Sequence, residues 1–416
     1  APVRVTTPTA TSDERSDDAV APSDPTVDAG VEARRVDRWT LGSVVVALGV
    51  AAFVLWREAE TEPYHIDELR QVRPYALGLD ALLDSSYAQE QPPLDVIVGA
   101  GMQRVLGVGD VLQRSHSMLA GLLALACLAM LMWRRGARLA IPATILLLAF
   151  VPTFPSYTSY ARPYALPLAL MIGYLLAVDL WLEQRRWWWG SLVAVIAALL
   201  PLSRVFEPPA LLVLASVTLV VFRRWNPQWG RAIWLPVGAA AAALLLVELP
   251  VYLRLQSRLT AYQGDAAASL GDQWQRIVDD SLPRLGDVLV NWWIVLVLVI
   301  AAAATPWVRR WLVQSWWFWP VLAMPVAFFV AFHLRTQPGQ PYYERYGYYF
   351  LPAVAIALGL LAESAVRAIR RPTSPLVVAT NVVVAALLAV LGAQLVVATV
   401  DDLRNSDDSP DYAALG

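Results

Sequence analysis

Apolar runs of about 20 residues, separated by short polar connections, dominate the pattern of this chain. Runs of this length predict transmembrane helices rather than the core helices of a soluble domain, because they match the thickness of a lipid bilayer. The predicted spans number about eleven: 39–56, 112–133, 139–154, 162–182, 188–202, 208–222, 233–253, 288–304, 312–332, 346–362 and 375–399. We therefore expect an all-α polytopic membrane protein.

Residues 1–38 have a different pattern. They are rich in Thr, Ser, Pro and Asp and lack the apolar core of a signal peptide, so a disordered tail is expected. The predicted organisation is this tail, a transmembrane domain over 39–400 with a long first loop at 57–111, and a short tail at 401–416.

The connections between the spans alternate in charge. Short cytoplasmic loops are enriched in positive residues. The arginine-rich connections and the N-terminus are therefore expected on the cytoplasmic side of a plasma (inner) membrane. This set contains Arg34, Arg35, Arg38, Arg134, Arg135, Arg138, Arg185, Arg186, Arg223, Arg224, Arg231, Arg309, Arg310, Arg367, Arg370 and Arg371. The other connections, which carry most of the unusual polar residues, are expected on the external face. We therefore expect the active site there.

The first external loop contains a helical pattern of its own. Apolar residues recur at spacings of 3 and 4, at Leu69, Val72, Ala76, Leu79 and Leu83, which predicts an amphipathic helix that breaks or restarts at Pro74. The apolar segment 94–106 is too short to cross a bilayer. Both segments are expected to lie along the outer membrane interface, where they would hold a lipid-borne substrate at headgroup level.

Composition narrows the function classes. The chain is 57% hydrophobic and 16% charged, and every basic residue is arginine. Its 18 Trp and 15 Tyr are typical of interfacial aromatic belts. The single cysteine, Cys127, excludes a disulfide within the chain. No P-loop or GxGxxG motif is present, so a cytosolic nucleotide sugar is not expected as a donor. No nucleic acid is expected as a partner.

An acidic pair, Asp67 and Glu68, lies about ten residues after the first span in "YHIDELRQVRPY". It is either a solvated charge pair or a catalytic group. A carboxylate at a partly desolvated interface is suited to act as a general base, because burial raises its pKa towards neutrality. Nearby arginines are suited to binding a phosphate.

Two further clusters contain tyrosine beside arginine. In "SYARPYALPLAL", Arg162 is flanked by Tyr160 and Tyr164; in "QPGQPYYERYGYYFLP", Arg345 lies between Tyr343 and Tyr346. Each is interpreted either as a membrane-interface belt or as a site for a lipid phosphate and its sugar. In the second cluster, Glu344 and Arg345 are alternatively a structural ion pair.

Other charged residues complete the candidates. Glu248 lies inside the seventh span, where a carboxylate is costly. Arg204 and Glu207 lie at the external turn 202–209, and Arg204 belongs either to a basic cavity or to a plain salt bridge. No cofactor is predicted with certainty, and a divalent cation is left open. Its ligands would be His65, Asp67 and Glu90, although their spacing matches no known metal signature.

Five motifs occur in a recognisable order: "HIDELR", "QPPL", "LQRSHSMLAGLLALACLAMLMWRRG", "SYARPYAL" and "ERYGYYFLP". In this order they resemble the GT-C glycosyltransferases, specifically the branch of protein O-mannosyltransferases and lipid A aminoarabinose transferases, over residues 60–352. The resemblance implies a GT-C fold and an inverting transfer from a polyprenyl-phosphate sugar on the external leaflet. It also implies Asp67 as the base, with Glu68 orienting it or the acceptor. Arg162 and Arg345 would lie near the donor phosphate.

Two departures from this family affect the expected site: the first removes a candidate phosphate contact, and the second concerns the acceptor. The family often has lysine before "PPL", where this chain has Gln91. A large domain after the last span, common in relatives, is not expected here, which favours a lipid or glycan acceptor over a protein. The alternatives are a lipid-linked sugar flippase or transporter, a ligase with a diphosphate donor, and a non-catalytic subunit of an envelope-synthesis complex.

Overall fold

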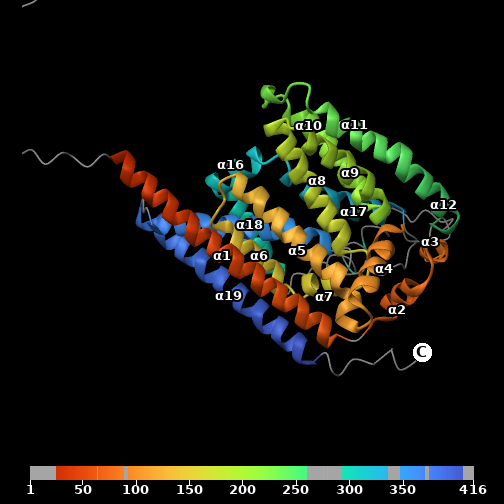
Figure 1. Ribbon diagram of the computed structural model, residues 1–416. Helices are drawn as coiled ribbons and strands as arrows, with labels where there is room; N and C mark the ends of the chain where they lie inside the picture. Colours follow the sequence, from red (N-terminus) through yellow and green to blue (C-terminus); the bar gives the residue numbers. More distant parts are fainter. Residues whose placement is uncertain are drawn as a thin grey trace, which may run out of the picture. The chain divides into compact units, whose positions relative to one another are not determined.

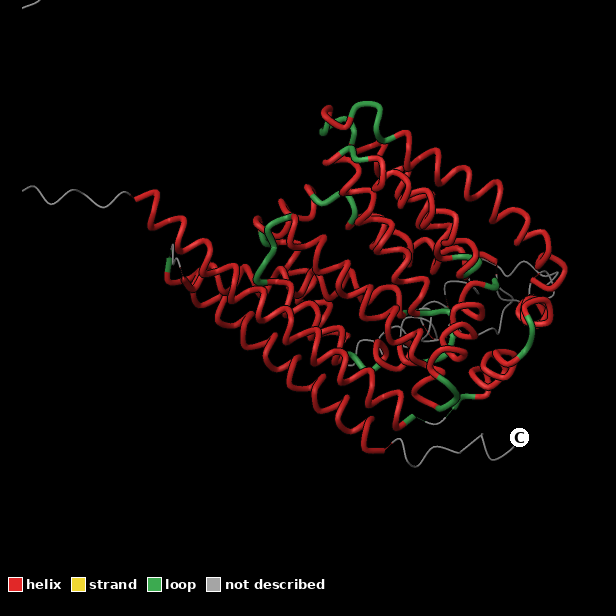
Figure 2. Tube along the Cα trace, viewed as in Figure 1, coloured by secondary structure: helices red, strands yellow, loops and turns green. Residues whose placement is uncertain are grey.

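The computed structural model describes residues 25–62, 64–88, 92–259, 292–335, 347–370 and 374–405, and positions 275 and 279. These residues form helices and short links, with no strand among them (Figure 2). The chain divides into two compact units, residues 1–42 and 43–416, and the packing below concerns the second unit. The helices with known bounds are α1 (Pro25–Thr61), α2 (Ile66–Val72), η1 (Arg73–Ala76), α3 (Leu79–Ala88), α4 (Leu94–Leu106), α5 (Asp110–Arg134), α6 (Ala140–Phe150), α7 (Thr153–Ser159), α8 (Ala165–Gln184), α9 (Trp187–Ser203), α10 (Glu207–Phe222), η2 (Pro227–Trp229), α11 (Trp234–Ala243), η3 (Leu244–Glu248), α12 (Leu249–Leu259), α15 (Trp292–Ala304), α16 (Pro306–Gln314), α17 (Phe318–Arg335), η7 (Tyr348–Phe350), α18 (Leu351–Arg370) and α19 (Pro375–Asn405).

The predicted polytopic all-α architecture is confirmed. Within the described ranges, six helices are long and apolar enough to cross a membrane: Arg38–Thr61, Asp110–Arg134, Ala165–Gln184, Trp234–Leu255, Tyr348–Arg370 and Val377–Asp401. Two bent pairs, α6 with α7 and α15 with α16, raise the number to eight if each is one span. Three shorter apolar helices lie over Trp187–Ser203, Glu207–Phe222 and Phe318–Val330. Each predicted span overlaps one of these features, while the count of eleven crossings stays a prediction.

Helix α1 begins earlier than the sequence suggested. It starts at Pro25, so residues 25–38 are helical although they were assigned to the disordered tail. The segment "VEARR" within this range consists mostly of good helix formers and leads into the apolar run without a glycine or proline after Gly30. The tail prediction for residues 1–24 lies outside the described residues.

The membrane helices of the second unit pack in neighbouring pairs. Helix α8 lies between α5 and α9, α10 packs on α17, and α18 packs on α6, α15 and α19 (Figure 1). Fully buried apolar residues along these contacts include Leu131, Leu175 and Leu211. Most of α19 is not covered by the rest of the chain, as expected of a helix whose apolar surface faces lipid.

The first loop folds into short helices, as predicted. Helix α2 ends at Val72, and Pro74 lies in the 3₁₀ turn η1 that follows. The residues of the predicted apolar stripe differ in burial beyond Val72: Ala76 and Leu79 are exposed, whereas Tyr75 and Leu82 are buried. A 3₁₀ turn has three residues per turn, so it rotates the following residues out of the α-helical register.

Two sharp bends shape the bundle. The axes of α6 and α7 meet at 74° around Val151 and Pro152, which ends the helix by removing a backbone donor. Helices α15 and α16 meet at 81°, and α16 carries arginines on one side and buried Val308 and Trp311 on the other. After the first bend, α7 leads to the segment 160–164, which lies beside the first loop.

A single glycine sets how closely α18 approaches α6. A Cβ added at Gly359 would lie 2.8 Å from the backbone oxygen of Ala140 and would overlap the Thr144 hydroxyl. We predict that Gly359→Ala destabilises the fold by about 1–3 kcal/mol through overpacking, lowering the unfolding temperature in detergent. Gly392→Ala on α19 is the matched control, since nothing lies within 4 Å of its added Cβ. Equal melting of the two variants would contradict this packing argument.

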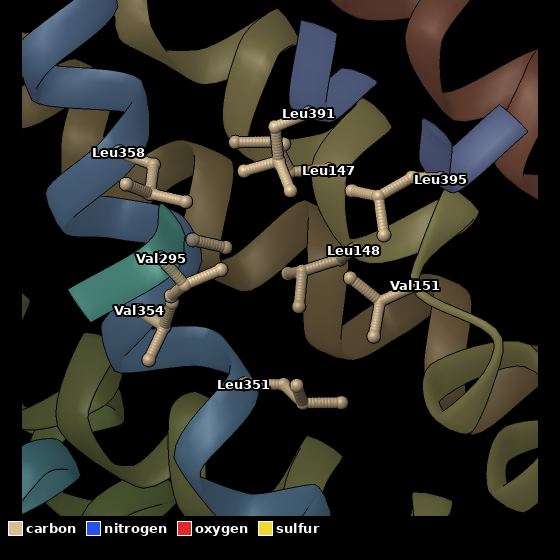
Figure 3. A pocket seen from close by; sticks show the side chains of 10 residues that line it. Leu147, Leu148, Val151, Val295, Leu351, Val354, Leu358, Leu391 and Leu395 are labelled. Carbon is tan, nitrogen blue, oxygen red and sulfur yellow. The ribbon is translucent and has the colours of Figure 1, made fainter. Parts of the chain in front are cut away.

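A small cavity lies between α6, α15, α18 and α19 (Figure 3). Its volume is about 20 Å³, enough for about one water molecule. The lining is apolar: Leu147, Leu148, Val151, Val295, Leu351, Val354, Ala355, Leu358, Leu391 and Leu395. With no polar group to hold a ligand, the cavity is a gap in helix packing rather than a binding site.

Candidate active site

The candidate site forms where the first loop, α5 and the link between α7 and α8 meet. Helices α2 and α3 of the first loop pack on α4, and α4 packs on α5, at one end of the bundle (Figure 1). The α7–α8 link, residues 160–164, reaches the same place and forms hydrogen bonds with Asp67 and Glu68 of α2. The fold thus brings together two of the sequence clusters that were predicted to contribute to one site.

Glu68 is the fixed centre of this region. Its carboxylate is fully buried and accepts two hydrogen bonds from Arg114, at 3.1 Å to Nε and 2.8 Å to Nη2. It also accepts the backbone N–H groups of Ala161, at 2.8 Å, and of His65, at 3.1 Å. The His65 contact closes a capping box at the start of α2. With four donors on two oxygens, Glu68 joins α2 to α5 and to the link between α7 and α8.

Arg114 is the main residue that the sequence interpretation missed. Its side chain is fully buried, and Nη1 donates to the backbone oxygens of Ala59, at 2.9 Å, and Glu62, at 2.6 Å. Its guanidinium also lies 4.5 Å from the Tyr64 ring centroid. An available signal was an arginine in the first turn of the predicted span 112–133, since a charge within a span needs a partner. Arg114 ties the end of α1 to α2 and α5.

Asp67 has a very different environment from its neighbour. Its side chain is 29% exposed and lies 3.6 Å from Arg162 Nη2 and 3.6 Å from Arg70 Nη1. At these separations the carboxylate of Asp67 forms ion pairs with both guanidinium groups, but the distances are too long for hydrogen bonds. The Arg162 guanidinium also donates to the Asp67 backbone oxygen at 3.3 Å. Asp67 is thus a partly exposed carboxylate held near two guanidinium groups.

His65 and Tyr160 border Asp67. His65 caps α2 by accepting the Asp67 backbone N–H on Nδ1, at 3.2 Å, and its ring stacks on Tyr160 with centroids 6.5 Å apart. Burial, followed by the carboxylates of Glu68 and Glu62, raises the pKa of the Tyr160 hydroxyl well above its ordinary value. Tyr160 therefore stays protonated and can donate a hydrogen bond.

The α7–α8 link presents Arg162 between its two tyrosines. In the backbone, the N–H of Arg162 donates to the carbonyl oxygen of Tyr160 at 2.8 Å, and the N–H of Tyr164 donates to the carbonyl oxygen of Arg162 at 2.7 Å. Tyr164 is buried against Tyr157 and Tyr348. The contact between Arg162 and Asp67 joins segments 95 residues apart. An arginine that only anchors a helix at the membrane interface would not need such a tertiary contact.

Arg204 lies behind this link. It donates to Glu207 Oε2 at 2.8 Å and to the backbone oxygen of Pro163 at 3.0 Å, and it covers the rings of Tyr164 and Tyr349. The predicted ion pair with Glu207 is therefore present. Its contact with Pro163 supports the residue next to Arg162.

Glu248 is not joined to this site. It ends the π-helical turn η3 and is half-buried, and within the described residues no hydrogen bond or ion pair links it to Asp67 or Arg162. Arg345, Tyr343, Tyr346 and Glu90 lie outside the described residues. The parts of the chain that are described contain no group of three or more His, Cys, Asp or Glu side chains arranged to hold a metal.

Known proteins give a likeness of fold rather than of sequence. No family model matches the chain, and no curated protein matches it in sequence. The structure is similar to ArnT from Cupriavidus metallidurans bound to undecaprenyl phosphate: 18% of residues are identical, 88% of this chain and 77% of that chain are covered, and the TM-score is 0.56. It is also similar to the apo state of ArnT, with 16% identity, coverage of 90% and 78%, and a TM-score of 0.55.

A third similar structure is the oligosaccharyltransferase AglB from Archaeoglobus fulgidus, in complex with an inhibitory peptide and a dolichol-phosphate. Identity is 13%, the TM-score is 0.53, and the likeness covers 89% of this chain but 56% of AglB. The predicted GT-C fold is confirmed. At these identities the likeness concerns the fold, and the site residues rest on the contacts described above.

Proposed function

We propose that this protein is a membrane glycosyltransferase that moves a sugar from a polyprenyl-phosphate donor to a hydroxyl group of a lipid or glycan acceptor. The observation that carries the proposal is the contrast between two adjacent acids. Glu68 is saturated by four donors, whereas Asp67 is partly exposed and lies 3.6 Å from Arg162 and Arg70. A carboxylate with a free approach is suited to accept a proton.

The donor side of the site is assigned to Arg162 and its tyrosines. A guanidinium matches the oxygens of a phosphate, and Tyr160 offers a hydroxyl donor on the same link. ArnT binds undecaprenyl phosphate and AglB binds dolichol-phosphate, which supports a lipid phosphate of this class here. Arg345, Tyr343 and Tyr346 remain predicted contributors, and the arginine alternation supports an external location.

The proposed reaction is a single displacement. Asp67 removes the proton from the acceptor hydroxyl as its oxygen attacks the anomeric carbon. The bond between that carbon and the phosphate oxygen breaks, the configuration inverts, and polyprenyl phosphate leaves with the electron pair. Arg162 stabilises the charge that develops on the departing phosphate.

The first experiment supplies different donors to purified protein in nanodiscs. We expect sugar transfer from a polyprenyl-monophosphate sugar to a lipid or glycan acceptor. Transfer only from a diphosphate-linked sugar would replace this proposal with a ligase. Movement of the donor across the bilayer without transfer, measured in proteoliposomes, would replace it with a flippase.

Arg162→Ala is expected to weaken donor binding. Loss of one charge-assisted contact costs about 1.5–3 kcal/mol, which is roughly 10- to 100-fold in the dissociation constant. Binding of polyprenyl phosphate to detergent-solubilised protein would measure the change.

Arg70→Ala is the matched control for Arg162→Ala. Arg70 lies at the same 3.6 Å from Asp67, but its side chain is 65% exposed against 14% for Arg162. We expect Arg70→Ala to change binding by less than about threefold, as exposed ion pairs contribute little. Equal losses in both variants would argue against Arg162 as the specific phosphate ligand.

A further inference from the structure

A second buried polar cluster holds the last turn of α2, on the same buried side as Glu68. It joins Gln71 of α2, Asp95 of α4 and His116 of α5, and all three residues are at least 96% buried. Gln71 Nε2 donates to Asp95 Oδ2, and His116 Nε2 lies 3.5 Å from the same oxygen. These residues lie 24 and 21 positions apart along the chain, so the cluster links three separate helices.

The geometry assigns the roles within this cluster. His116 Nδ1 lies 3.1 Å from the backbone oxygen of Gln113, which only accepts, so Nδ1 carries a hydrogen. The Ser117 hydroxyl, 3.3 Å away, can donate to Nε2. Asp95 is then placed to accept the Gln71 amide, and His116 packs beside it without competing for that amide.

Helical spacing divides the side chains of α2 into two sets. Glu68 and Gln71 are three residues apart and both point into buried partners, whereas Asp67 and Arg70 share the more exposed side. With seven residues, α2 is too short to be stable alone, so its position depends on such ties. Glu68 holds the first turn through Arg114, and Gln71 holds the last turn through Asp95.

Building this cluster from polar groups is costly. Asp95 is 1% exposed, and its Oδ1 has no hydrogen-bond partner within the described ranges. Apolar residues of similar size would be expected to bury more favourably, because a buried carboxylate must be compensated by its partners. A directional bond, in contrast, fixes the rotation and height of a short helix more sharply than apolar packing does.

We propose that Gln71 and Asp95 are positioning residues, which hold α2 so that Asp67 is aimed at the acceptor hydroxyl. This inference rests on the proposed function of Asp67. Neither residue touches the substrate; they act through α2. The neighbouring ionisable groups that complete the surroundings are Glu68 on α2, Tyr75 on η1, Arg114 on α5 and Tyr64 before α2.

The test exchanges the two chemical groups across the contact. Gln71→Glu alone places a carboxylate against the Asp95 carboxylate, which breaks the tie. Adding Asp95→Asn restores an amide–carboxylate pair in the reverse sense. Asp95→Asn alone keeps an oxygen that accepts the Gln71 N–H but removes the Asp95 charge, so it separates the effect of the hydrogen bond from that of the charge.

We expect Gln71→Glu to lower kcat for sugar transfer by about 10- to 100-fold, because small misplacements of a catalytic group cost this much. The KM for the donor should stay within about twofold, since Arg162 lies on a different segment. Hydrogen exchange should quicken in residues 66–72 and remain unchanged in α8. The double variant should recover both kcat and exchange protection.

Three results would overturn the positioning role in an active protein: wild-type kcat in Gln71→Glu, no recovery in the double variant, or accelerated exchange throughout the bundle. A wild-type protein that transfers no sugar would instead overturn the proposed function. The exchange measurement needs no activity, so the two failures are distinguishable.

Discussion

Asp67→Asn is expected to abolish most sugar transfer, lowering kcat by about 10²–10⁴-fold, the usual contribution of a general base. Asparagine keeps the size of the side chain and leaves the backbone contact to Arg162 in place. It replaces the negatively charged carboxylate, which would accept the hydroxyl proton, with an uncharged amide. The initial rate of transfer from a polyprenyl-phosphate sugar in nanodiscs is the measurement.

Asp84→Asn provides the matched control for Asp67→Asn. Asp84 lies on α3 in the same loop, its side chain is 79% exposed, and its ion pair with Arg254 has the same 3.6 Å separation. This variant should retain full activity. Donor binding should also survive in Asp67→Asn, because the guanidinium of Arg162 is untouched. Full transfer activity in Asp67→Asn would refute the assignment of Asp67 as the base.

The sequence predicted the membrane fold well because apolar length is a local property. Every predicted span overlaps an apolar helix of the structure, and the loop helices restart near Pro74 as expected. The bends were not predicted. The 74° turn between α6 and α7 depends on how α7 packs against α5 and α8, which no single window of residues encodes.

The site was predicted in part. Asp67, Arg162 and Tyr160 were selected for their types and positions, and the structure brings them together. The resemblance implied Asp67 as the base and Glu68 as an orienting group, but the buried partner of Glu68 was not readable from "HIDELR". Arg114, 46 residues further along the chain, pairs with Glu68, and Asp67 stays partly exposed. Such pairing depends on tertiary contacts, as does the bond between Arg204 and Pro163.

The same division gives the largest expected effect on stability. Arg114→Leu removes both guanidinium bonds to Glu68 and both bonds to the end of α1. It leaves a fully buried carboxylate with its backbone donors alone. Breaking one side of a buried ion pair costs about 3–5 kcal/mol, so this variant should unfold at a markedly lower temperature in detergent.

Two further variants separate the cost of the unpaired charge from the loss of packing around Arg114. Adding Glu68→Met to Arg114→Leu removes the stranded carboxylate, and apolar replacement of both partners is often close to neutral in stability. The double variant should therefore melt above Arg114→Leu. Arg57→Ala is the control, because it breaks the exposed pair with Glu60 and should cost less than about 1 kcal/mol. If Arg114→Leu melted like Arg57→Ala, the Glu68–Arg114 pair would not be what anchors α2, and the accessibility of Asp67 would need another cause.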